Sequence, residues 1–141
     1  MSAGSKNKMN FIITILIIFV IADVLIVGYV IFKRSRKKLN PKLIEEIQTE
    51  WKKLIRENDP RHAIMEADKL LDHALAQMGY SGSLGAKLKK TPKLFSKIND
   101  VWAAHKVRNN IAHKLNYEIT EAIYKKTMLQ FKEAFKDLNI F

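Results

Sequence analysis

The stretch 107–114, VRNNIAHK, holds the residues whose types and spacing could act on a phosphodiester. Arg108 and Asn109 are adjacent, and His113 follows four residues after Asn109. Metal-independent cleavage of RNA needs groups that move protons to and from the reacting oxygens and a fixed cation beside the phosphate. Histidine titrates near neutral pH, and the guanidinium of arginine matches phosphate oxygens. Arg108, Asn109 and His113 are therefore candidate catalytic residues, and a polar stripe on a solvated helix is the alternative.

The helix expected to carry these residues sets a geometric condition. Each residue of a helix turns the chain by about 100°, so Arg108 and His113 point about 140° apart on an ideal helix. They converge only if the helix ends or distorts near His113, or if a second chain completes the site. His105, Asn109 and His113 share one face because they lie at four-residue steps. His105 is thus an accessory candidate, with a helix-capping or interface role as the alternative.

Other familiar chemistries lack their residues in this sequence. The absence of cysteine excludes a disulfide framework, a thiolate nucleophile and a cysteine-based zinc site. No Gly-rich phosphate loop, Ser-His-Asp set or His-Glu-x-x-His helix is present. His62 and Glu66 lie four residues apart, but two ligands do not make a metal site, and a surface pair is the simpler interpretation. We expect neither a metal nor another cofactor.

A glycine-rich, basic segment precedes the helix of interest. The stretch 79–93, GYSGSLGAKLKKTPK, holds three of the five glycines, which predicts a loop with at most a short helix near residues 84–89. The lysines of this stretch, together with Lys97 just after it, could bind an RNA backbone, because no acidic residue lies among them. A solvated cationic face is the alternative. These candidate RNA-binding residues are Lys87, Lys89, Lys90, Lys93 and Lys97.

An apolar run from Phe11 to Phe32 precedes all of these features. Its 22 residues contain one charge, and at about 1.5 Å per residue they reach the thickness of a hydrocarbon core, about 30 Å. The run continues into a basic cluster, which favours an anchor over a cleaved signal peptide. We expect an extracytoplasmic N-terminus over 1–10, a transmembrane helix over 11–32 and a basic juxtamembrane linker over 33–40.

The charges that flank the apolar run predict its orientation. Lys6 and Lys8 precede the run, whereas KRSRKK at 33–38 follows it, and the more basic flank stays in the cytoplasm. Residues 1–41 carry seven Lys or Arg and one Asp, so over half of the net charge of +11 belongs to this topology signal. We expect a single-pass cell-membrane protein with a cytoplasmic C-terminal domain. The basic cluster could also contact anionic lipid headgroups, although a plain stop-transfer flank is the simpler interpretation.

Asp23 interrupts the apolar run near its middle. An ionised side chain there costs about 2.5 to 3.5 kcal/mol on insertion scales, and each central Ile, Leu, Val or Phe contributes about 0.3 to 0.6 kcal/mol. The 17 such residues of the run outweigh that cost. Asp23, protonated or paired, could face another helix and join two chains, or it could be a tolerated residue that desolvation keeps neutral.

Residues 41–141 show helical periodicity and no alternating β-branched run. Asn-Pro at 40–41 and Asp-Pro at 59–60 are start signals, and Thr120 is a cap. These signals predict four helices, over about 41–57, about 60–78, from about 94–99 into the quoted stretch, and from Thr120 to about Leu138. The expected fold is all-α, a transmembrane helix followed by a four-helix up-and-down bundle with an irregular loop in its middle.

The sequence has the order Arg-Asn-x-x-x-His late in the third helix of a predicted four-helix domain, followed by a turn and a long amphipathic helix. This arrangement resembles the HEPN superfamily. The mark of that family is an Arg, usually a polar residue next, and a His four to six residues after the Arg; Arg108, Asn109 and His113 match it. The resemblance covers about residues 41–141. In the antitoxin-controlled branch a modified tyrosine lies two residues after the histidine, but Leu115 occupies that place here and Tyr117 comes two residues later.

This resemblance implies two classes of function. Family members are often ribonucleases that dimerise so that two motifs form one cleft, and others are inactive binding or sensing domains. We therefore expect a membrane-held homodimer with metal-independent endoribonuclease activity on RNA. The alternative is a non-catalytic module that binds a protein or nucleotide at the membrane. An uncontrolled nuclease would need a regulatory partner, and the sequence does not identify one.

Overall fold

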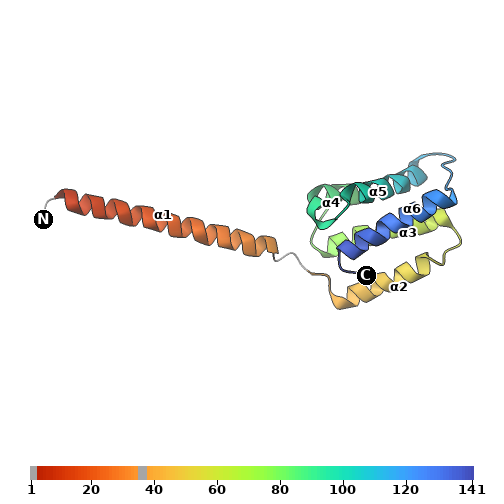
Figure 1. Ribbon diagram of the computed structural model, residues 1–141, viewed down its shortest axis with the longest axis horizontal. Coiled ribbons are helices and arrows are strands. Elements are labelled where there is room, and N and C mark those ends of the chain that lie inside the picture. The colour runs from red at the N-terminus through yellow and green to blue at the C-terminus, as the bar shows by residue number, and fades with distance from the viewer. Residues whose placement is uncertain (1–2, 35–37) are drawn as a thin grey trace. The chain divides into compact units, whose positions relative to one another are not determined.

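The computed structural model describes residues 3–34 and 38–141 (Figure 1). The chain divides into two compact units, Met1–Arg36 and Lys37–Phe141. Residues 35–37, part of the KRSRKK cluster, lie outside the described residues, as do residues 1–2. Over the described residues every regular element is helical and no strand occurs, so the prediction of an all-α chain is confirmed.

The first unit is one long helix, α1, Ala3–Arg34. It begins earlier than the predicted span, and its 32 residues reach about 48 Å at about 1.5 Å per residue. Apolar side chains such as Phe11, Phe19 and Leu25 are exposed along it. A helix that is apolar on all sides needs an apolar surrounding. This helix is therefore long and apolar enough to cross a membrane.

The second unit contains four longer helices and two short ones. They are α2, Pro41–Leu54; α3, Pro60–Gln77; α4, Leu84–Lys90; a 3-10 turn η1, Pro92–Leu94; α5, Ile98–His113; and α6, Glu121–Asp137. The four longer helices alternate in direction along the chain (Figure 1). Only α2 ends well before its predicted limit, because the apolar pattern stops at Leu54 and the following residues are exposed.

Local signals account for the ends of these helices. Asn40, Asp59 and Thr120 each accept a hydrogen bond from a backbone N–H of the helix that follows. A cap of this kind contributes about 1 kcal/mol. At the end of α3, Gly79 has φ +92°, and the N–H of Tyr80 donates to the carbonyl of Leu75, which closes a Schellman motif. The start and stop signals in the sequence thus act as predicted.

Helix α3 lies at the centre of this unit, where it packs against α2, α4, α5 and α6. Its buried side includes Leu71 and Leu75, which are fully buried. Aromatic residues fill the space beside it, and the ring of Trp51 meets that of Phe135 edge to face, 5.5 Å between centroids. The core extends to Leu39, in the segment predicted as linker. This packing fixes which side of α5 faces α3, and so positions the candidate site.

Candidate functional site

The polar residues of α5 meet an acidic residue of α3 that the sequence analysis did not select. Asp68 lies on the inner side of α3 and is 4% exposed, among apolar neighbours such as Ile64 and Leu71. A carboxylate removed from water in this way is stable only if charged or hydrogen-bonding groups compensate it. The groups that compensate Asp68 come from α5, 37 or more residues later in the chain.

Asp68 holds two side chains of α5 at once. One carboxylate oxygen lies 2.7 Å from Nδ1 of His105, and the other lies 3.4 Å from Nε of Arg108. That Nε is buried and makes no hydrogen bond, so its contact with Asp68 is an ion pair without hydrogen-bond geometry. Arg108 also donates from Nη1 to Oδ1 of Asn109, 3.2 Å away. The guanidinium is therefore held by neighbours on both sides.

The same contacts define the protonation of His105. A guanidinium can only donate, so the amide atom of Asn109 that faces it is the oxygen. Nδ2 of Asn109 then faces Nε2 of His105, at 3.2 Å, and donates to it. His105 must accept at Nε2, and its proton lies on Nδ1, where it is donated to Asp68. Both ring nitrogens of His105 are thus engaged.

These four residues line an open cleft of about 430 Å³ between α3 and α5. Its remaining lining comes from Lys69 and Asp72 of α3 and from Ser83 and Leu84 at the start of α4. Asp72 accepts from the ammonium of Lys87 at 2.8 Å. The charged groups at this cleft therefore have partners of opposite charge, and the cleft is polar without a large net charge.

His113 does not line this cleft. It is the last residue of α5, and its side chain is exposed without a partner among the described residues. The helix ends there, which meets one of the two conditions for convergence with Arg108. Leu115, two residues later, is 96% exposed. The structure thus groups Arg108, Asn109 and His105, and leaves His113 outside the cleft at the helix end.

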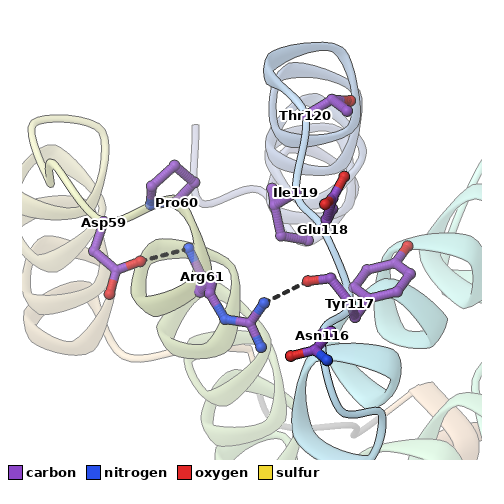
Figure 2. Close-up of a pocket in the computed structure, with 8 residues that line it drawn as sticks. All are labelled: Asp59, Pro60, Arg61, Asn116, Tyr117, Glu118, Ile119 and Thr120. Carbon is purple, nitrogen blue, oxygen red and sulfur yellow. Dashed lines mark hydrogen bonds between the residues drawn. The ribbon is translucent and has the colours of Figure 1, made fainter.

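A second residue missed in the sequence, Arg61, holds that end of α5 in place. It lies in the first turn of α3, and its guanidinium donates to the carbonyl of Tyr117 (Figure 2) and also to that of Ile111. One side chain thereby joins the start of α3 to the last turn of α5 and to the loop before α6. The cleft around it, about 630 Å³, is also lined by Asp59 and Glu118. The position of His113 therefore depends on a residue 52 positions earlier.

The predicted RNA-binding lysines separate into two groups. Lys87 is 3% exposed, and its ammonium is hydrogen-bonded to the carboxylate and the carbonyl of Asp72, so it is not available to a backbone phosphate. The others, Lys89, Lys90, Lys93 and Lys97, are exposed. Lys90 donates to the carbonyl of Ser81. The exposed lysines extend from the end of α4 to the start of α5.

Over the residues that the structure describes, no group of three or more His, Asp or Glu side chains lies close enough together to hold a metal ion. His62 is exposed, and Glu66 forms an ion pair with Lys69 three residues later, as in an ordinary surface pair. Comparison of the chain with protein-family models, with curated proteins and with solved structures found no match.

Proposed function

We propose that the second unit is a HEPN-like, metal-independent endoribonuclease that acts as a homodimer at the cytoplasmic face of a membrane. The observation that carries this proposal is the pair of groups that α5 presents. The helix holds Arg108 against Asp68, with 26% of the Arg108 side chain exposed. It then ends at His113, which is exposed. A fixed guanidinium beside the scissile phosphate and a free imidazole nearby are the groups that cleavage by the 2′-hydroxyl needs.

Each residue of the motif has a separate role in the proposed cleavage. Arg108 binds a phosphate oxygen and stabilises the charge that builds up on it, and Asn109 and Asp68 hold the guanidinium in place. His113 takes the proton of the 2′-hydroxyl as that oxygen bonds to phosphorus, or gives a proton to the leaving 5′-oxygen as its bond to phosphorus breaks. The exposed lysines of the α4–α5 segment attract the RNA backbone. His105 has no free ring nitrogen, so its role is to position Asp68 and Asn109 rather than to transfer protons.

Dimerisation supplies what one chain lacks. In one chain His113 lies outside the cleft that Arg108 lines, so a second copy is needed to bring the two groups to the same phosphate. Leu115, next to the motif and 96% exposed, is the apolar residue best placed to be covered by that copy. Helix α1 would anchor each chain, with its basic flank in the cytoplasm. An unidentified regulatory partner would restrain the activity.

A non-catalytic binding module is the second candidate function. It is favoured by the pairing of charges at the cleft, since Asp68 pairs with Arg108 and Asp72 pairs with Lys87. A site that must attract a phosphodiester gains from an unpaired cation, whereas a site for a neutral polar group or a protein segment does not need one. In this case Arg108 and Asn109 would bind a ligand and His113 would have no chemical role.

Cleavage of RNA by the full-length protein in detergent separates the two. We expect the wild-type protein to cut single-stranded RNA in the presence of a chelator and to leave a 2′,3′-cyclic phosphate. His113→Ala removes a proton-transfer group and should lower the rate by about 10² to 10⁴. Arg108→Ala should cause a similar loss. Both variants must keep the wild-type helicity and mass, which circular dichroism and light scattering measure.

Two lysine variants serve as matched controls. Lys93→Met removes an exposed cation and should reduce the slope of log affinity against log salt by about 0.7, the value for one phosphate contact with a single strand. Lys87→Met removes a buried, paired cation and should leave that slope unchanged. If the wild-type protein cuts no RNA, or if His113→Ala cuts as fast as wild type, the ribonuclease proposal is wrong and the binding module stands.

A further inference from the structure

A separate cleft in the second unit carries basic groups that the proposed reaction does not use. It has a volume of about 540 Å³ and lies between the start of α2 and the end of α3. Lys38, Lys42 and His73 are its basic lining residues. Glu46 is the one carboxylate in the lining, and the amides of Asn40 and Gln77 complete the polar groups.

These basic groups have no partners within the described residues. Over residues 3–34 and 38–141, no side-chain hydrogen bond or ion pair engages Lys38, Lys42 or His73, whereas Lys53, Lys69 and Lys136 pair with a glutamate three residues before them. Lys42 and Glu46 lie four residues apart but form no ion pair, in keeping with the weaker stabilisation when the lysine precedes the acid. Two ammonium groups and an imidazole are therefore free to bind an anion.

The position of the cleft in the chain indicates the source of that anion. Lys38 is the last residue of KRSRKK, and α1 ends only four residues before it, at Arg34. With α1 across the membrane and its basic flank inside, this part of the folded unit is tethered at the cytoplasmic leaflet. Anionic lipids of that leaflet strengthen the binding of a protein segment to the membrane by about fivefold for each basic residue near the surface.

We propose that this cleft binds the headgroup of an anionic phospholipid. Lys38 and Lys42 bind the phosphate oxygens, and His73 and Gln77 donate further hydrogen bonds. Glu46 would repel a bare phosphate but accepts from a hydroxyl or ammonium group, so the cleft fits a phosphate diester that also carries a donor. The bound lipid would hold the start of α2 and the end of α3 on the membrane surface. This inference rests on the proposed anchorage and topology, not on ribonuclease activity.

The absence of cysteine from the chain allows a direct test with the full-length protein. Ala76 is exposed on α3, three residues from His73, and Ala122 is exposed on α6. The Ala76→Cys and Ala122→Cys proteins are each placed in nanodiscs of phosphatidylcholine alone, or of phosphatidylcholine with phosphatidylserine, and labelled with a maleimide. We expect phosphatidylserine to slow labelling at position 76 by about fivefold or more and to leave position 122 unchanged.

Variants then assign the protection to this cleft. Adding Lys42→Gln and His73→Gln to the Ala76→Cys protein should abolish the slowing, and the matched pair Lys52→Gln and His62→Gln, also exposed on α2 and α3, should preserve it. Equal labelling rates in both lipids, or slowing that survives Lys42→Gln and His73→Gln, would overturn the proposal.

Two further outcomes would also overturn it. Slowing by inorganic phosphate in phosphatidylcholine discs would show a soluble phosphate ligand instead of a lipid. A protein that does not enter the discs at all would remove the anchorage and this inference together. A protein that enters the discs but shows no protection would remove this inference alone.

Discussion

At the scale of single residues, the candidate site depends on one buried carboxylate. Asp68 is 4% exposed and contacts both His105 and Arg108. Its carboxylate contacts Nδ1 of His105 and pairs with the guanidinium. The hydrogen bonds of Asn109 then follow from the two groups that Asp68 holds. A change in Asp68 should therefore affect three other side chains.

Asp68→Asn is the substitution that tests this dependence. The amide keeps the shape but removes the charge that compensates Arg108, and breaking a buried ion pair costs about 3 to 5 kcal/mol. Because the Arg108 side chain is 26% exposed, water offsets part of the loss, and we expect a cost of about 2 kcal/mol. Thermal unfolding followed by circular dichroism should show a midpoint lower by roughly 5–10 °C.

Glu66→Gln is the matched control for Asp68→Asn, since it makes the same change on the same helix. Its partner Lys69 is largely exposed, so the free energy of unfolding should change by less than about 0.5 kcal/mol. Equal midpoints for Asp68→Asn and wild type would contradict the compensating role of this carboxylate.

The burial of Asp68 could have been predicted from the apolar positions around it in the sequence. Ile64, Asp68, Leu71 and Leu75 follow one another at helical spacing, so an acid stands on the apolar side of the predicted second helix. A charged residue in such a place needs a partner. Its identity, however, depends on how α3 and α5 pack, and that packing joins residues 37 positions apart. Local patterns predict the acid's burial but not its contacts.

At the scale of elements, the parts that could be predicted are those with local causes. The caps at Asn40, Asp59 and Thr120 are set by residues within three positions, and the structure has helices starting at each of them. The burial of Lys87 could not be predicted, because it depends on the packing of α4 against α3. Lysine is almost never buried unless it is paired, and here Asp72 supplies the partner.

The end of α5 depends on another element in the same way. Arg61, from the first turn of α3, donates to the carbonyl of Tyr117 (Figure 2) and also to that of Ile111. The last carbonyls of a helix have no partner within it, so a cation that binds one of them stabilises the final turn. The backbone on either side of His113 is thus held by a side chain of α3 as well as by α5 itself.

Arg61→Ala should remove both of these hydrogen bonds from α3 to the end of α5 and the loop that follows it. We expect the amides of the last turn of α5, near residues 111–114, to exchange with deuterium about thirtyfold faster, because two hydrogen bonds that each contribute about 1 kcal/mol are lost. The amides at the centre of α3 should exchange as in wild type. Hydrogen exchange followed by mass spectrometry measures both segments in one experiment.

Arg56→Ala provides the comparison for Arg61→Ala. Arg56 is exposed and has no side-chain partner among the described residues, so its removal should leave exchange unchanged everywhere. If Arg61→Ala also leaves the last turn of α5 unchanged, the helix end is held by the neighbouring backbone and not by this side chain.

At the scale of the whole molecule, two separate features could bring two chains together. Asp23 lies on α1 with no partner among the described residues, and a polar side chain within a membrane can join helices by hydrogen bonding. Leu115 is 96% exposed beside the candidate site and would gain from burial against a second copy. The proposed chemistry needs the second contact, because only that contact brings His113 to another Arg108.

Replacing each feature separately identifies the contact that forms the dimer. Light scattering of the full-length protein in detergent should give the mass of two chains, and Leu115→Asp should give the mass of one because it buries a charge at the interface. Ile55→Asp is the matched control, since Ile55 is another exposed apolar residue, 54% exposed, in a loop of the same unit, and it should remain dimeric. If Leu115→Asp stays dimeric and Asp23→Leu becomes monomeric, association occurs through α1. The two motifs would then have no shared cleft, and the ribonuclease proposal would lose its geometric basis.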